Sequence, residues 1–120
     1  MQLAKGKYIA NMDADDISLP TRLEKQFTFL EKNPDVAVIA SKLVLINQNN
    51  DEIGIWPEDY HISDRNEIRK VLPIINCIGQ PTVMIKNSVM KEIGYNTKYI
   101  NGIEDWGLWL DILSRHLGFN

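Results

Sequence analysis

The sequence is short of the residues and patterns that mark several large classes of protein. It holds a single cysteine, Cys77, so it forms no internal disulfide, and we interpret this thiol as a small buried hydrophobe. The formal net charge is −3, which provides no basic surface for nucleic acid. No run of about 18 apolar residues occurs, so we expect no membrane-spanning segment. Such a chain fits a reducing cytoplasm.

The remaining composition is that of a globular domain. Hydrophobic residues make up 44% of the chain and charged residues 24%, which is ordinary for a folded protein. With 120 residues the chain holds at most one domain, so residues 1–120 are treated as one unit.

Hydrophobic spacing predicts strands and helices along most of the chain. Strands rich in apolar and β-branched residues are expected at 7–12, 36–46, 52–56 and 82–85. Proline and glycine signals bound helices expected at 20–33, 66–72 and 88–93, and another from 104 onward. Two helices have apolar stripes, formed by Leu23, Phe27 and Leu30 and by Trp106, Leu110, Leu113 and Leu117.

Three carboxylates follow the first expected strand within four positions: Asp13, Asp15 and Asp16. Clustered like charges repel one another, and a purely structural turn needs no more than one of them. Mg²⁺ and Mn²⁺ take oxygen ligands and are often shared between protein carboxylates and substrate phosphates. The stretch therefore predicts a metal site beside a phosphorylated ligand. A solvated turn with a helix cap is the alternative, and a short motif alone favours that alternative.

Two more acids, Glu104 and Asp105, open the last expected helix. A carboxylate within hydrogen-bond reach of a hydroxyl can act as a general base. The helix dipole also favours negative charge at this position, so simple capping explains the same two residues. The sequence alone leaves both interpretations open.

Further blocks accompany these acids in order: 6–10, 20–26, 33–36, 80–84 and 104–110. Together with Asp13-Ala14-Asp15-Asp16, they resemble family 2 glycosyltransferases of the GT-A fold. The resemblance implies an α/β fold, a partial GT-A three-layer sandwich with a mixed sheet. In that family the acidic motif follows a nucleotide-binding part, so we expect this chain to be a fragment that lacks it.

The resemblance also implies a metal-dependent, inverting transfer of a sugar from a nucleotide-diphosphate donor. Asp15 would bind the divalent metal, Mn²⁺ or Mg²⁺, directly. Asp13 would reach the metal or the ribose through water, and Ala14 would lie beside the donor. The polysaccharide setting of the family implies a saccharide or a lipid-linked acceptor, and a location in the cytoplasm or at the inner membrane surface.

On the acceptor side, the resemblance assigns the general base to Asp105, with Glu104 beside it. Trp106 is expected to provide an aromatic platform for the acceptor. Gln80 stands where many relatives have a histidine, so it can donate a hydrogen bond but carries no charge. A turn fixed by Pro81 explains the same block without any contact to substrate.

Three other expectations remain open. One is that the chain is a non-catalytic fragment that only binds metal and acceptor; without a donor pocket we expect it to be inactive alone. A second is a haloacid-dehalogenase-like phosphatase, although Ile17 and Pro20 depart from that motif. The third is a homodimer, because a sheet that lacks its first strands exposes an edge.

Overall fold

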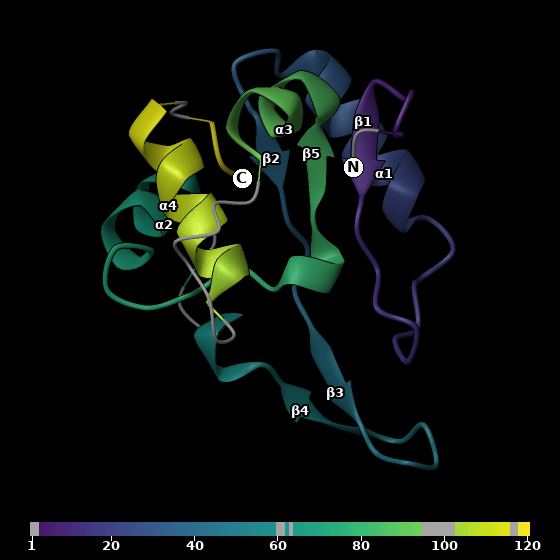
Figure 1. Ribbon diagram of the computed structural model, residues 1–120. Helices are drawn as coiled ribbons and strands as arrows, with labels where there is room; N and C mark the ends of the chain where they lie inside the picture. Colours follow the sequence, from purple (N-terminus) through teal and green to yellow (C-terminus); the bar gives the residue numbers. More distant parts are fainter. Residues whose placement is uncertain (1–2, 60–61, 63, 95–102, 116–117) are drawn as a thin grey trace.

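A central sheet of three short strands organises the chain. The computed structural model describes residues 3–59, 62, 64–94, 103–115 and 118–120. β5 (Met84–Lys86) lies in the middle, and β1 (Tyr8–Ala10) and β2 (Val38–Ile39) pair with it antiparallel on either side. Outside these antiparallel strands, an isolated parallel bridge joins Val38 to Phe119, and the C-terminal end of the chain lies beside β2 (Figure 1).

Alternating side chains give this sheet two buried faces, because successive residues of a strand point to opposite sides. Val38 lies opposite Ile85, and both belong to the main hydrophobic core. The next pair, Ile39 and Met84, belongs to a second, smaller core. The sheet is therefore covered by helices on both sides.

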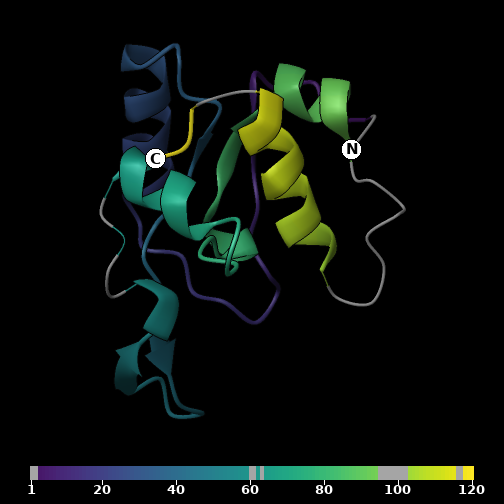
Figure 2. The ribbon, with the colours of Figure 1, turned by 90° about the vertical axis from the view of Figure 1, so that its left-hand side faces the viewer.

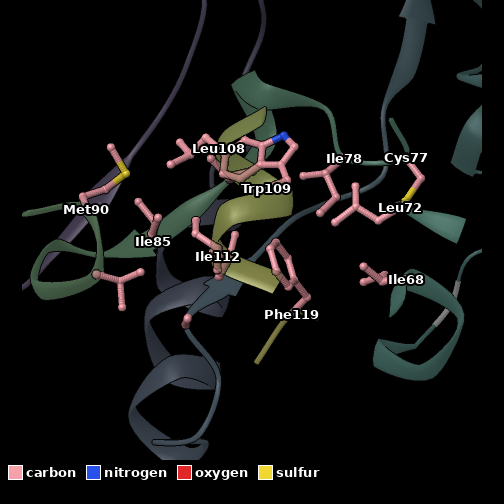
Figure 3. Close-up of a cluster of buried hydrophobic side chains, with 14 residues drawn as sticks. Ile68, Leu72, Cys77, Ile78, Ile85, Met90, Leu108, Trp109, Ile112 and Phe119 are labelled. Atoms are coloured by element: carbon pink, nitrogen blue, oxygen red, sulfur yellow. The ribbon is translucent and has the colours of Figure 1, made fainter. Parts of the chain in front are cut away.

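The two helical layers are unequal. α1 (Arg22–Lys32) covers the smaller core, to which it contributes Leu30. α3 (Asn87–Ile93) and α4 (Glu104–Arg115) cover the opposite face, as Figure 2 shows. α2 (Arg65–Val71) adds Ile68 to the main core, and the labelled side chains of this core converge around α4 in Figure 3. In the ranges that the structure describes, no helix is long and apolar enough to cross a bilayer.

The predicted apolar stripe of α1 is only partly right. Leu30 is buried, but Leu23 and Phe27 are 52% and 49% exposed. The position that points inward with Leu30 is Gln26, which is 3% exposed. This polar residue is tolerated there because its amide is hydrogen-bonded to other parts of the chain.

The stripe predicted for α4 is rotated relative to the buried face. Trp106, Leu110 and Leu113 pack only at the border of the main core, and Leu117 lies outside the described residues. The fully buried residues are Gly107, Leu108, Trp109 and Ile112. Trp109 has no exposed surface and is a core residue. Cys77 is buried, as expected for a small hydrophobe.

The single strand predicted at 36–46 is divided into two. β2 ends at Ile39, and β3 (Val44–Ile46) pairs with β4 (Glu52–Ile55) in a separate two-stranded sheet. This hairpin extends away from the central sheet, and every residue of its two strands is exposed (Figure 1). A 3-10 turn, η1 (Pro57–Asp59), follows it.

Residues 118–120 pair with β2 along its outer edge. The Gly118 carbonyl accepts hydrogen bonds from the amides of Ala37 and Val38, at 2.6 and 3.0 Å. The amide of Ala40 donates to the Asn120 carbonyl at 2.8 Å. Phe119, which is 1% exposed, fills the main core between these bonds. This segment therefore holds β2 from the side opposite β5.

Candidate functional site

The acidic loop, residues 11–16, begins where β1 ends. A turn closes it, in which the Asp16 amide donates to the Asp13 carbonyl at 3.3 Å. Asp13, Ala14 and Asp15 are exposed. Among the described residues, no side chain forms a hydrogen bond or ion pair with Asp13 or Asp15. Their carboxylates are thus available to a ligand.

Arg22, the first residue of α1, holds the start of this loop. Its Nη2 donates to the Asn11 carbonyl at 2.7 Å and lies 3.4 Å from the Val83 carbonyl. Burial lowers the pKa of Arg22, and the negative charge of Asp16 opposes that shift. Asp16 therefore offsets the charge of the partly buried Arg22. In this it differs from Asp13 and Asp15, which have no charged partner among the described residues.

Gln26 lies one turn further along the same face of α1. Its Oε1 accepts from Arg22 Nε at 3.3 Å, while its Nε2 donates to the Thr82 carbonyl at 2.7 Å and to Ser41 Oγ at 2.9 Å. Sequence reasoning missed this residue. The i, i+4, i+8 spacing of Arg22, Gln26 and Leu30 was the available signal, but two of these three residues are polar, so the spacing did not look like a buried face.

Asp105 lies in the first turn of α4 and is partly buried. Its Oδ2 accepts a hydrogen bond from Asn76 Nδ2 at 3.0 Å, and its Oδ1 accepts from the Trp106 amide at 2.7 Å. Each carboxylate oxygen can accept a second hydrogen bond. Glu104 is exposed beside it. Asn76 is a second residue that sequence reasoning missed, because it belongs to the loop after α2.

The two predicted acceptor residues lie in different settings. Trp106 donates its indole N–H to the Leu72 carbonyl at 2.8 Å and packs against the main core, so the ring is fixed in orientation. Gln80 begins a 3-10 turn, η2 (Gln80–Thr82), that leads through Val83 into β5. The turn fixed by Pro81 that the sequence predicted is therefore present.

The acid-bearing segments lie at the same end of the sheet. Figures 1 and 2 show the acidic loop and the start of α4 at the end where β1 finishes, and η2 lies between them in Figure 1. These segments are far apart in sequence, and the antiparallel pairing of β1 with β5 brings the loop and η2 together.

The carboxylates of the acidic loop fit only one type of metal site. Within the described ranges, no three His, Cys, Asp or Glu side chains are grouped so that they would hold a metal by themselves. A catalytic Mg²⁺ is commonly held by one or two carboxylates together with substrate phosphates. Asp13 and Asp15, which are exposed and pair with no side chain that the structure describes, fit that second type of site.

Comparison with known proteins shows where the chain belongs. Residues 1–94 match the family described as Glycosyl transferase family 2. This chain is a member of that family. The resemblance seen in the sequence and the partial GT-A fold are thereby confirmed, and the relatives described next are named glycosyltransferases rather than phosphatases.

Several relatives are glycosyltransferases by name. The chain is 40% identical over 116 residues to the O-antigen biosynthesis glycosyltransferase WbnJ of Escherichia coli, with 94% of the chain and 43% of that protein covered. It is 34% identical over 121 residues to the uncharacterized glycosyltransferase MJ1057 of Methanocaldococcus jannaschii, with 100% of the chain and 40% of that protein covered.

A third relative carries a more specific name. The chain is 30% identical over 108 residues to a UDP-Gal:alpha-D-GlcNAc-diphosphoundecaprenol beta-1,3-galactosyltransferase of Escherichia coli, with 89% of the chain and 38% of that protein covered. This member of Glycosyl transferase family 2 therefore spans about two fifths of the length of the relatives described here.

Proposed function

We propose that this chain forms the metal and acceptor part of an inverting glycosyltransferase that uses a nucleotide-diphosphate sugar. One observation carries the proposal: Asp13 and Asp15, which have no side-chain partner among the described residues, lie on a segment at the same end of the sheet as the hydrogen-bonded Asp105. The names of the relatives support the class, since one acts in O-antigen biosynthesis and another uses UDP-Gal and a diphosphoundecaprenol-linked sugar.

On the donor side, Asp15 and Asp13 would bind Mn²⁺ or Mg²⁺. A divalent cation supplies charge that neutralises the departing diphosphate. Neither carboxylate is paired within the described residues, so neither must give up a protein partner to bind. The exposed Ala14 places only a methyl group between them, which leaves room for the donor.

On the acceptor side, Asp105 takes the proton of the attacking hydroxyl. The acceptor oxygen forms its bond to the anomeric carbon while the bond from that carbon to the diphosphate oxygen breaks, and the proton moves to Asp105. A single displacement of this kind inverts the anomeric carbon. Gln80 and Trp106 lie on the neighbouring segments and would orient a saccharide or lipid-linked acceptor, in the cytoplasm or at the inner membrane surface.

The decisive test uses the complete enzyme that contains this segment. Asp105→Asn should lower kcat by about 10²- to 10⁴-fold, the usual contribution of a general base. Asp15→Ala should raise the Mn²⁺ concentration needed for half-maximal rate. Asp111→Asn, on the same helix as Asp105, is the matched control and should leave both values unchanged. Near-normal rates in both site variants would remove the assignment.

Stereochemistry gives an independent test of the mechanism. NMR of the product from an α-linked sugar nucleotide should show a β linkage. Retention of the α configuration would exclude the single displacement.

The alternative of a non-catalytic fragment applies to the 120-residue chain itself. It covers 43% or less of the relatives described above, so we expect the isolated chain to transfer no sugar from any nucleotide donor. Robust turnover by the isolated chain would overturn the view that a donor-binding part is needed.

A homodimer is a further part of the proposal. β1 pairs only with β5 in the described part of the chain, so its outer edge has unpaired backbone groups. A second copy would cover this edge. Size-exclusion chromatography with light scattering should show a concentration-dependent dimer, and a monomer at high concentration would contradict it.

A further inference from the structure

One short segment, Asn76–Val83, contacts both parts of the proposed site. We propose that this spacer segment sets the position of the general base relative to the acidic loop, and that Asn76 and Gln26 are the positioning residues at its two ends. The inference rests on the proposed function, because it concerns the same two acid-bearing segments.

At the first end, the Asn76 side chain connects the spacer segment to α4. Its amide nitrogen donates to Asp105 Oδ2 at 3.0 Å, and its Oδ1 accepts from the Ile78 amide at 3.3 Å. Cys77 and Ile78 are 5% and 2% exposed and belong to the main core. The donor to Asp105 is therefore held by a buried backbone turn, which fixes the plane of the carboxylate.

At the second end, the spacer segment is tied to α1 and to the acidic loop. Gln26 Nε2 donates to the Thr82 carbonyl, and Thr82 in turn donates its hydroxyl to the Gly79 carbonyl at 2.8 Å. The Val83 carbonyl accepts from the Asn11 amide at 3.0 Å, at the first residue of the acidic loop. Thr82 and Val83 are 5% and 0% exposed.

The segment between these ends has little freedom. It contains a 3-10 turn with a proline, and Cys77, Ile78, Thr82 and Val83 near its two ends are buried in packed surroundings. A change at either end therefore moves the base and the acidic loop relative to one another. Because a misplacement of about 1 Å can lower a rate about 10²-fold, these two residues matter without touching substrate.

The first test is a double-mutant cycle on kcat in the complete enzyme. Asn76→Ala should lower kcat about 10- to 100-fold and leave the KM for the donor unchanged. In an Asp105→Asn background the same substitution should have no further effect, because Asn76 acts through Asp105. Asn66→Ala, an exposed asparagine of α2, is the matched control.

Two results would overturn this half of the inference. One is an unchanged kcat in Asn76→Ala, and the other is an equal loss in both backgrounds. If the proposed function itself fails, Asp105→Asn alone will have near-normal activity, which is a separate and recognisable outcome. Asn76→Leu, which keeps a similar side-chain size but has no donor for Asp105, replaces Asn76→Ala if that variant does not fold.

The second test asks whether the two ends act as a unit. Gln26→Met keeps the size of the side chain but removes the donor to the Thr82 carbonyl. Gln26→Glu also removes this donor, but it keeps an acceptor for Arg22. The fold-loss in kcat for Gln26→Met combined with Asn76→Ala should be smaller than the product of the two single losses, since one freed end already releases the spacer segment. A loss in the double variant that equals or exceeds the product of the two single losses would contradict a shared role.

Hydrogen exchange supplies a measurement that does not depend on activity. In the complete enzyme with Gln26→Met, the amide of Asn11 should exchange faster, because its acceptor Val83 is no longer held by the neighbouring bond to Thr82. Gln48→Met, in the exposed hairpin turn, is the control. Unchanged protection of Asn11 in Gln26→Met would show that Gln26 does not hold this end.

Discussion

Gly118→Ala is a sharp test of the fold because the space at this glycine is defined entirely by backbone. A methyl group at Gly118 would lie 2.0 Å from the Asp35 carbonyl oxygen, 2.5 Å from Val36 Cα and 2.7 Å from the Ala37 nitrogen. None of these atoms is the end of a flexible side chain. Relief therefore requires residues 118–120 to move away from β2.

The expected loss of stability follows from what that movement breaks. Four backbone hydrogen bonds join residues 118–120 to the segment 37–40, and each contributes about 1 kcal/mol net. Partial exposure of Phe119, now 1% exposed, adds to this at up to about 1.5–3 kcal/mol. We expect the free energy of unfolding to fall by about 4–7 kcal/mol, a large share of the roughly 5–15 kcal/mol of a typical domain.

Urea unfolding followed by far-UV circular dichroism and by tryptophan fluorescence measures this change, since Trp109 is fully buried. Gly79→Ala is the matched control. There the added methyl group would meet Leu43 Cδ1 at 2.6 Å, the end of a side chain that can rotate, so a loss below about 1 kcal/mol is expected. A Gly118→Ala variant within about 0.5 kcal/mol of the parent would refute the reasoning, as would equal losses in the two variants.

Two further predictions concern α1. Leu30→Ala should lower the free energy of unfolding by about 2–5 kcal/mol because Leu30 is 1% exposed, whereas Leu23→Ala, at 52% exposure, should change it by less than about 1 kcal/mol; equal losses in urea melts would contradict the packing described. Hydrogen bonds from Lys7 and Tyr8 lower the pKa of Glu31 below its ordinary value of 4.5. The small stabilisation from these bonds is therefore fully present above pH 4.5, and it is lost as the pH falls through the lowered pKa. Glu31→Gln should flatten this part of the pH dependence of unfolding, and an unchanged slope would count against the pair.

Local sequence signals predicted helix and strand boundaries well where residues close in sequence determine the conformation. Gly94, with a φ of 63°, ends α3 where the sequence placed the helix stop. Glu52 to Ile55 forms the second arm of a hairpin, within the strand predicted at 52–56. These features depend on residues that are close in sequence, so a short sequence pattern contains the information needed to predict them.

Other features depend on partners far along the chain, and local patterns could not show them. Gln26 is buried because the Thr82 carbonyl, 56 residues away, accepts its hydrogen bond. Asn76 is set against Asp105, 29 residues away. The division of the expected strand into β2 and β3 likewise reflects which strands pair with each half, since β2 pairs with β5 and β3 with β4. Gln26 and Asn76 thus acquire their roles in the site from tertiary contacts, which local sequence patterns do not reveal.

The order β1-β5-β2 has a consequence for synthesis on the ribosome. β1 is synthesised before its partner strand, since Tyr8 pairs with Lys86. β2 likewise precedes both of its partners, β5 on one edge and residues 118–120 on the other. During synthesis on the ribosome, β1 and β2 must therefore remain unpaired with these neighbours until β5 has been made. A nascent chain of this kind exposes open strand edges for an extended period, and the central sheet forms only after β5 has left the exit tunnel.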